Sequence, residues 1–264
     1  MRWDPAEYLR FADERGRPFH DLVARIDAEA PATVVDLGCG PGNLTATLAD
    51  RWPDAQVEGV DSSPEMIERA RELVTSATPR LRFTLADVRE WAPEAPVDVL
   101  VSNATLQWVP RHVELLPELL GYVAPSGWLA FQVPGNFDQP SHTEIAAVRA
   151  TERWRDALPA DLPAPAVEEP IDYVRALSEL GCVVAAWVTT YLQILPGEDA
   201  VLHWLAGTAL RPVFSVLSEA DQEEFLADVR PRLRSAYPQE PFGTVLPYRR
   251  IFVVARTPGQ GGQP

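Results

Sequence analysis

The stretch that decides the fold class of this chain is Val34-Val35-Asp36-Leu37-Gly38-Cys39-Gly40-Pro41-Gly42. The β-branched run that ends at Leu37 predicts a short buried strand, and residues 43–52 predict the helix that follows. Gly38 and Gly40 lack a Cβ atom, so the chain can turn tightly there and a ligand can approach the backbone. The free amide groups of the helix point at the same place. The stretch therefore predicts a site for a nucleotide-type cofactor.

An acidic residue, Asp61, follows the second expected strand (56–60) and lies 21 positions after Gly40. An acid at about this spacing accepts hydrogen bonds from ribose hydroxyls. The glycine spacing is G-x-G-x-G and differs from the G-x-G-x-x-G of dinucleotide sites, and Asp36 stands just before it. A carboxylate repels a pyrophosphate and attracts an ammonium group. The pattern therefore favours a cofactor that carries an ammonium group.

Strand and helix patterns alternate through the first half of the chain, which predicts an α/β fold with a doubly wound, mostly parallel sheet. Residues 1–29 are expected to be helical. Further strands are expected at 81–85, 97–102, 128–133, 182–195 and 249–255, and further helices at 63–75, 112–122, 141–154, 171–180, 198–209 and 218–233. The alternation breaks after Val133, so helical inserts are expected in the second half.

The composition limits the classes of partner. The net charge is −15, the isoelectric point is about 4.7, and all 23 basic residues are Arg. A phosphate backbone needs a basic face, so neither nucleic acid nor an anionic membrane is expected as a partner. Cys39 and Cys182 lack a metal-ligand spacing, and no metal is expected. Without a charged-then-apolar leader or a long apolar run, the expected location is the cytoplasm.

The D-L-G-C-G-P-G run resembles the first motif of the class I methyltransferases. Ala86-Asp87-Val88 is similar to the stretch that holds the adenine amine in that family, and Ser102-Asn103-Ala104 to the strand end under the sulfonium. The resemblance implies a seven-stranded Rossmann-like sheet with a helical lid or insert, and S-adenosyl-L-methionine as cofactor with S-adenosyl-L-homocysteine as product. The implied cofactor-binding residues are Asp36, Gly38, Cys39, Gly40, Asp61, Ser62, Met66, Asp87, Val88, Asn103 and Ala104.

Five of these positions have a structural alternative. Gly38 and Gly40 can serve a tight turn alone, and Asp61 can cap a helix, although Ser63 already offers a cap. Asp87 can be a solvated loop acid. Cys39 is expected to be a small packing residue and not a nucleophile.

A closer resemblance, to the trans-aconitate methyltransferases, extends from about Trp3 to Arg256. It rests on Trp3-Asp4-Pro5 with Tyr8-Leu9, Phe11, Glu14-Arg15 and Arg17-Pro18, on Asp61-Ser62-Ser63-Pro64-Glu65-Met66-Ile67, on Asn103-Ala104-Thr105-Leu106-Gln107-Trp108, on Leu210-Arg211-Pro212, and on Tyr248-Arg249-Arg250 with the strand that follows. The resemblance implies methyl transfer to a carboxylate of trans-aconitate, a small anionic metabolite, to give a monomethyl ester.

A carboxylate oxygen is already ionised at pH 7, so no general base and no catalytic side chain is expected. The enzyme has to position the acceptor and match its charge. The planar fork of Arg suits carboxylates, so Arg211 and Arg250 are expected to bind the substrate, with Arg249, Arg15 or Arg17 as further members. Trp3, Tyr8, Trp108 and Tyr248 are expected to wall the pocket. Most of the four histidines, His20, His112, His142 and His203, are expected to be solvated or to cap helices.

The expected organisation is one methyltransferase domain over residues 1–256, acting as a monomer. Residues 1–30 are expected to form a helical lid, 31–135 the cofactor-binding half, 136–256 a substrate-side half with helical inserts, and 257–264 a flexible tail. Two alternatives stay open. One is a class I methyltransferase for another small carboxylic acid or metabolite, and the other is a cofactor-binding module without catalysis.

Overall fold

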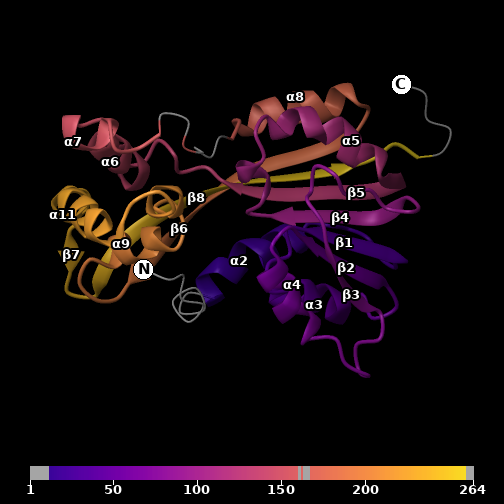
Figure 1. The fold of residues 1–264 in the computed structure, drawn as a ribbon. Coiled ribbons are helices and arrows are strands. Elements are labelled where there is room, and N and C mark those ends of the chain that lie inside the picture. The colour runs from indigo at the N-terminus through magenta and orange to yellow at the C-terminus, as the bar shows by residue number, and fades with distance from the viewer. Residues whose placement is uncertain (1–11, 160–161, 163–166, 260–264) are drawn as a thin grey trace. The chain divides into compact units, whose positions relative to one another are not determined.

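The computed structural model describes residues 12–159, 162 and 167–259 of the 264-residue chain (Figure 1). These residues divide into two compact units. The larger unit holds residues 15–133, 167–188 and 251–259, and the smaller unit holds 12–14, 134–159, 162 and 189–250. The units therefore differ from the halves expected at 31–135 and 136–256, because two late segments, 167–188 and 251–259, belong with the larger unit.

The sheet has the strand order β3-β2-β1-β4-β5-β8-β6, and a further strand, β7, pairs antiparallel with β8. The strands are β1 (Thr33–Leu37), β2 (Gln56–Asp61), β3 (Leu81–Leu85), β4 (Val97–Asn103), β5 (Val123–Pro134), β6 (Val183–Leu195), β7 (Gln239–Glu240) and β8 (Gly243–Arg256). The pairs β1–β2, β1–β4, β2–β3 and β4–β5 are parallel. This confirms the doubly wound, mostly parallel sheet, in which β7 was not expected.

In the larger unit, helices cover both faces of the sheet (Figure 1). Helices α3 (Asn43–Arg51) and α4 (Pro64–Arg71) pack against β2, and α4 also packs against β3. On the other face lie α5 (Leu116–Gly121) and α8 (Pro170–Glu179), whose apolar side chains share one core cluster with those of the strands. This core includes Leu37, Leu100, Leu119, Phe131, Leu177 and Ile251. Burial of this apolar surface stabilises the packing of the helices on the sheet.

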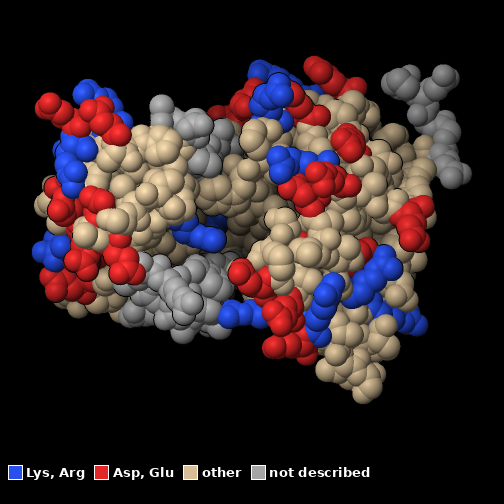
Figure 2. Space-filling model, in the orientation of Figure 1, with Lys and Arg blue, Asp and Glu red and all other residues tan. Residues whose placement is uncertain are grey.

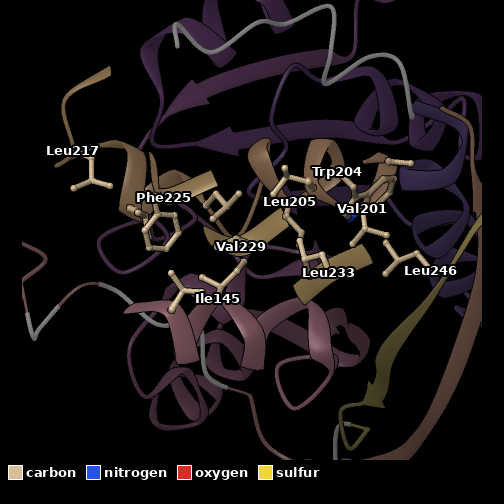
Figure 3. Packing of buried hydrophobic residues seen from close by; sticks show 14 of the residues in the cluster. Ile145, Val201, Trp204, Leu205, Leu217, Phe225, Val229, Leu233 and Leu246 are labelled. Carbon is tan, nitrogen blue, oxygen red and sulfur yellow. The ribbon is translucent and has the colours of Figure 1, made fainter. Parts of the chain in front are cut away.

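The smaller unit has its own hydrophobic core (Figure 3). It is built from α6 (Pro140–Arg149), α7 (Glu152–Arg155), α9 (Ala200–Ala206), α10 (Arg211–Phe214), α11 (Glu219–Ala236) and parts of β6 and β8. Trp154 is fully buried, its ring meets Phe225 edge to face at 5.2 Å, and its Nε1–H donates to Asp228 Oδ2 at 2.7 Å. The indole is thus buried with its polar group satisfied.

Several element boundaries differ from the sequence-based predictions. Within the described residues the first helix, α2, spans Ala12–Val23 and ends before the expected residue 29, and α4 ends at Arg71 instead of 75. The helix expected at 112–122 begins as a 3₁₀ turn over His112–Leu115, and the one expected at 141–154 is interrupted between α6 and α7. Strand β5 begins five residues early, at Val123, because a bulge around Ser126 (φ 63°) carries the strand through a stretch that resembles a turn.

The C-terminal strand is also longer than expected: β8 begins at Gly243 instead of Arg249, with Pro247 inside it. After it, Thr257 is buried and its Oγ1–H donates to the Ala124 carbonyl at 2.7 Å, while the Pro258 carbonyl accepts the Ser126 N–H. The expectation of a flexible tail from 257 is therefore wrong for these two residues, because hydrogen bonds anchor them to the larger unit.

Two surface properties bear on partners. On the face of the described chain that Figure 2 draws, acidic and Arg side chains are interspersed, and the Arg side chains form no continuous surface there. Among the helices that the structure describes, none combines the length and the apolar character needed to cross a membrane.

Candidate cofactor site and methyltransferase family

The glycine loop after β1 is held against the end of β2 by its backbone. The N–H groups of Gly38 and Cys39 both donate to the Val60 carbonyl, at 2.7 and 3.0 Å. Gly38 has φ 78°, and a Cβ atom there would lie 1.9 Å from Thr105 Oγ1. Gly40 has φ 55°, but a Cβ atom there would have no neighbour within 4 Å. Gly38 is therefore required by the fold, whereas Gly40 borders open space that a ligand can enter.

The Asp61 carboxylate bridges two segments at the carboxyl edge of the sheet. Its Oδ2 accepts the Gly40 N–H at 2.9 Å, and its Oδ1 accepts the Ser63 N–H at 2.9 Å. Ser63, and not Asp61, caps α4, because Ser63 Oγ accepts the Met66 N–H at 3.3 Å. A carboxylate has about four acceptor positions, so Asp61 keeps capacity for two ribose hydroxyls. Ser62 beside it is exposed and Met66 is half-buried.

Asp36 lies inside the protein and not on its surface. It is 2% exposed, and Thr45 Oγ1–H donates to its Oδ2 at 2.6 Å. Burial raises the pKa of Asp36 to about 7; the Thr45 hydrogen bond opposes this shift and the charge of Asp61 adds to it. Asp36 can therefore act on an ammonium group through its charge, without offering an exposed oxygen. Burial likewise raises the pKa of the neighbouring Cys39 thiol, which fits the expected packing residue.

Asp87 follows β3 and is engaged by a local cation. Its Oδ1 accepts the backbone N–H and the Nε–H of Arg89, both at 2.9 Å, and Nη2 of Arg89 lies 2.6 Å from Oδ2. These hydrogen bonds lower the pKa of Asp87 to about 2. Val88, the next residue, is half-buried against the core of the larger unit. Asp87 was predicted from the sequence, whereas its partner Arg89 was not.

At the end of β4, Asn103 stands in register with Gln132 of β5. Ala104 adopts φ 54° and donates its N–H to the Gln132 carbonyl at 2.9 Å, while Gln107 Nε2–H donates to the Ala104 carbonyl at 2.6 Å. The Oδ1 atom of Asn103 is buried and, among the described residues, has no hydrogen-bond partner. An unpartnered buried acceptor beside a positive-φ residue is a feature of ligand sites and is costly otherwise.

The expected substrate residues fall in both units. Arg211, Arg249, Arg250 and Tyr248 belong to the smaller unit, and Arg17 and Trp108 to the larger one. Arg211 is exposed at the start of α10, and Arg249 Nη1–H donates to the Gly135 carbonyl at 3.0 Å. Arg17 is exposed and Trp108 is 46% exposed. Arg15 lies in α2, but its side chain is outside the description, and Trp3 and Tyr8 lie outside the described residues.

Tyr248 and Arg250 are buried. The Tyr248 ring meets Trp204 edge to face at 5.5 Å within the core of the smaller unit, and the Arg250 guanidinium carbon lies 4.2 Å from the Tyr248 ring centre. A cation stacked on an aromatic face is stabilised by the ring quadrupole. Tyr248 therefore supports Arg250 from the core side.

Sequence comparisons place the chain among known enzymes. A family profile described as a methyltransferase domain matches residues 34–127. A trans-aconitate 2-methyltransferase of Rhodococcus jostii is 53% identical over 258 residues, with 96% of this chain and 99% of the relative covered. The enzyme of the same name from Streptomyces avermitilis is 51% identical, with 96% of each chain covered, and that of Mycobacterium marinum is 46% identical, with 97% of each covered. The chain belongs to the trans-aconitate 2-methyltransferase family.

Solved structures confirm the fold of the family. The YcgJ protein of Bacillus subtilis has a TM-score of 0.59 at 14% identity, with 91% of this chain and 99% of that chain covered. A methyltransferase of Haloferax volcanii, in complex with the Trm112 methyltransferase activator, has a TM-score of 0.58 at 18% identity, with 96% and 93% covered. At these identities the likeness shows the Rossmann-like methyltransferase fold.

The histidines differ partly from expectation. His20 and His203 are exposed, as expected. His112 is buried, with Nε2 2.7 Å from the Tyr173 hydroxyl, and burial lowers its pKa, so the expectation of a solvated or capping residue is wrong for it. His142 is half-buried, and burial lowers its pKa to about 4. For His112 the partner, Tyr173, is distant in sequence, whereas the contacts of His142 are with Phe137 and Ser141 nearby.

Gln107 contacts a predicted site residue, Ala104, but was not itself predicted. It is buried, it fixes the Ala104 carbonyl, and its Oε1 has no hydrogen-bond partner within the described chain. The signal was available, since Gln107 stands in the Asn103–Trp108 stretch that carries the family resemblance.

Proposed function

We propose that this chain transfers a methyl group from S-adenosyl-L-methionine to a carboxylate of trans-aconitate, giving a monomethyl ester and S-adenosyl-L-homocysteine. The family, whose members named trans-aconitate 2-methyltransferase are 46–53% identical to this chain, supports the reaction. The observation that carries the cofactor part is the Asp61 carboxylate, which bridges Gly40 and Ser63 beside the open space at Gly40.

The residues around the glycine loop fit this cofactor. In the proposal Asp61 accepts the ribose hydroxyls, and Gly38, Cys39 and Gly40 offer backbone to the methionine part. Asp36 favours the ammonium group through its charge. Asn103 and Ala104 lie under the sulfonium, and the unpartnered Asn103 Oδ1 supports this assignment. The adenine is assigned to Asp87, Val88, Ser62 and Met66; Arg89 has to leave part of the Asp87 carboxylate free for this contact.

Methyl transfer to a carboxylate does not require a side chain that acts as a general base. In an in-line displacement the carboxylate oxygen forms a C–O bond to the methyl carbon while the C–S bond breaks, and the electron pair of that bond stays on sulfur. The acceptor is ionised at neutral pH, so no proton has to be removed. The rate enhancement then comes from alignment of the two reactants and from charge complementarity.

The acceptor part of the proposal rests on arginine. The net charge of −15 repels a tricarboxylate at long range, so binding needs local cations. We assign this role to Arg211 and Arg250, with Arg249, Arg15 and Arg17 as further members and Trp3, Tyr8, Trp108 and Tyr248 as walls. In this proposal the chain acts as one methyltransferase domain, as a monomer in the cytoplasm, with residues 1–30 as its lid.

A transfer assay with purified full-length protein tests the proposal. Trans-aconitate, cis-aconitate, isocitrate and citrate are compared with a lipid-like carboxylic acid, a small amine and a neutral alcohol, with methylated product identified by mass spectrometry. We expect the highest kcat/KM for trans-aconitate. The proposal fails if a neutral or cationic acceptor is methylated well while trans-aconitate is ignored at millimolar concentration. Cofactor binding without transfer to any acceptor indicates a non-catalytic module instead.

A further inference from the structure

The loop between β5 and α6 carries a buried amide, Asn136, whose side-chain oxygen is unpartnered within the described chain. Asn136 is 1% exposed, and its Oδ1 has no hydrogen-bond partner among the residues that the structure describes. A buried amide oxygen without a hydrogen-bond partner is costly in a folded protein and calls for an explanation. The loop lies entirely in the smaller unit, outside the cofactor residues described above.

The backbone around Asn136 is fixed from both sides. Before it, Gly135 donates its N–H to the Arg249 carbonyl at 2.9 Å and accepts Arg249 Nη1–H at 3.0 Å. After it, the Asn136 carbonyl accepts the Gln139 N–H at 3.1 Å and a hydrogen bond from the His142 ring. These bonds fix the backbone from which the Asn136 side chain projects.

The His142 ring is itself held in place. Its Nδ1 lies 3.0 Å from Ser141 Oγ, and its ring meets Phe137 edge to face at 5.0 Å. The Ser141 N–H donates to the Tyr237 hydroxyl of α11's C-terminal end at 2.9 Å. Because burial lowers the pKa of His142 to about 4, the ring is neutral at neutral pH and adds no charge to the loop. His142 thus acts as a support for Asn136.

We infer that Asn136 is a substrate-binding residue that donates a hydrogen bond to one carboxylate of the acceptor, and that His142 is its positioning residue. The inference rests on the proposed function. Oxygen and nitrogen of an amide are assigned from their hydrogen-bond partners, and with no donor near Oδ1 the amide can equally present its NH₂ group. That group matches a carboxylate oxygen, and it is rigid, polar and uncharged.

The chain itself limits how far this amide lies from the cofactor residues. Asn136 follows Gln132, the register partner of Asn103, by four residues. Four residues span at most about 14 Å. The Asn136 loop is therefore the direct continuation of the strand that pairs with the end of β4.

The role of Asn136 follows from its neutral charge. Arginines bind carboxylates through charge and hold almost any small acid, whereas a fixed amide selects the acid that places an oxygen at one point. We therefore expect Asn136 to determine which acid is accepted more than how strongly anions bind in general.

The experiment compares acids that differ by one carboxylate in two variants of the full chain. Asn136→Ala is assayed with trans-aconitate and with glutaconate, which lacks the central carboxylate of trans-aconitate. We expect a 10- to 100-fold higher KM for trans-aconitate, the range for a lost hydrogen bond to a charged group. KM for glutaconate and the Kd of S-adenosyl-L-homocysteine should stay within twofold. Gln139→Ala, an amide in the same loop whose backbone bond is kept, is the matched control.

His142→Phe separates positioning from direct contact. It should raise KM for trans-aconitate less than Asn136→Ala, and it should add nothing in the Asn136→Ala background, because His142 acts on the acceptor only through the Asn136 amide. If His142→Phe raises KM by the same factor in the wild type and in Asn136→Ala, the positioning role of His142 is contradicted.

A second measurement covers the case in which Asn136→Ala fails to fold. Asn136→Asp keeps the size and places a negative charge at the same point, so it should weaken trans-aconitate binding more than Asn136→Ala. In the wild type, the side-chain NH₂ resonances of Asn136, assigned by their loss in Asn136→Asp, should shift when trans-aconitate is added to protein saturated with S-adenosyl-L-homocysteine.

Two results overturn the inference. One is an active Asn136→Ala enzyme whose KM for trans-aconitate is unchanged, and the other is the absence of any shift of the amide resonances on acceptor binding. A wild-type enzyme that ignores trans-aconitate but methylates another acid contradicts the proposed function instead. The same two measurements, made with that acid, then decide whether Asn136 binds the acceptor.

Discussion

The Asp61 carboxylate accepts the Gly40 N–H across 2.9 Å and so ties the loop after β1 to the end of β2. The second oxygen of the same carboxylate accepts the Ser63 N–H at the start of α4. One side chain therefore fixes two backbone segments and keeps acceptor capacity for a ligand.

Asp61→Ala should weaken cofactor binding by about 1.5–3 kcal/mol, because a hydrogen bond to a charged group is lost and the Gly40 loop loses its anchor. Calorimetry with S-adenosyl-L-homocysteine measures the change. Glu68→Ala, an exposed acid on α4, is the control and should leave the affinity unchanged. An unchanged affinity in Asp61→Ala removes the basis for the site.

The two glycines should respond differently to substitution. Gly38→Ala should destabilise the fold by about 2–5 kcal/mol, because it adds left-handed strain to a clash with Thr105. Gly40→Ala should cost only the strain, about 1–2 kcal/mol. Gly40→Val should in addition block the open space and abolish cofactor binding. Urea unfolding measures the loss of stability in Gly38→Ala and in Gly40→Ala. A larger loss in Gly40→Ala would contradict the assignment of Gly38 as the position that the fold requires.

Asp36 should make stability depend on pH. Its pKa is raised from 3.8 to about 7, so between these values the folded state binds the proton that the unfolded state has lost. Stability from this group therefore falls as pH rises from about 4 to about 7 and is constant above 8. The full effect is at most on the order of 4 kcal/mol.

Asp36→Asn is isosteric and keeps an acceptor for Thr45, so it should lose this pH dependence and exceed the wild type in stability at pH 8. Urea unfolding of both proteins from pH 5 to 8 provides the comparison. A stability difference that is the same at every pH would contradict the raised pKa.

Catalysis and cofactor binding should separate by pH. With an ionised carboxylate as acceptor, kcat should be flat from about pH 6 to 9. The cofactor KM should fall from pH 5.5 to 7.5, as Asp36 ionises and attracts the ammonium group, and Asp36→Asn should lack this dependence. A kcat that rises as one proton is lost near neutrality indicates a general base that the proposal lacks.

Arg211→Ala should lower kcat/KM for trans-aconitate by an amount that corresponds to roughly 2–5 kcal/mol, if the ion pair between Arg211 and a substrate carboxylate is buried. The loss should come from a higher KM, and the affinity for the cofactor should stay unchanged. Arg211→Lys should restore only part, since an ammonium lacks the bidentate fork. Arg232→Ala, which breaks the exposed ion pair with Glu144, is the control and should have no effect on KM. Equal KM values in all four proteins refute the role of Arg211.

The sequence by itself determined the order of strands and helices in the larger unit, the position of the glycine loop after β1 and the family. These depend on local properties: the run of β-branched residues before Gly38, the cap Ser63-Pro64, and glycines that must adopt positive φ. The predicted starts of β5 and β8 were wrong because Ser126 and Pro247 resemble turn residues. In the fold, the hydrogen bonds between paired strands override these local preferences.

Only the tertiary structure decided which side chains are buried and with what partners. Burial raises the pKa of Asp36 to about 7 while Thr45 hydrogen-bonds its carboxyl group, and Tyr248 lies in a core against Trp204. Asn136 is enclosed with a side-chain oxygen that has no partner among the described residues. The division into two units also follows from packing, because 167–188 and 251–259 return to the larger unit late in the chain. Desolvation depends on segments that are distant in sequence, so a reading of neighbouring residues cannot supply it.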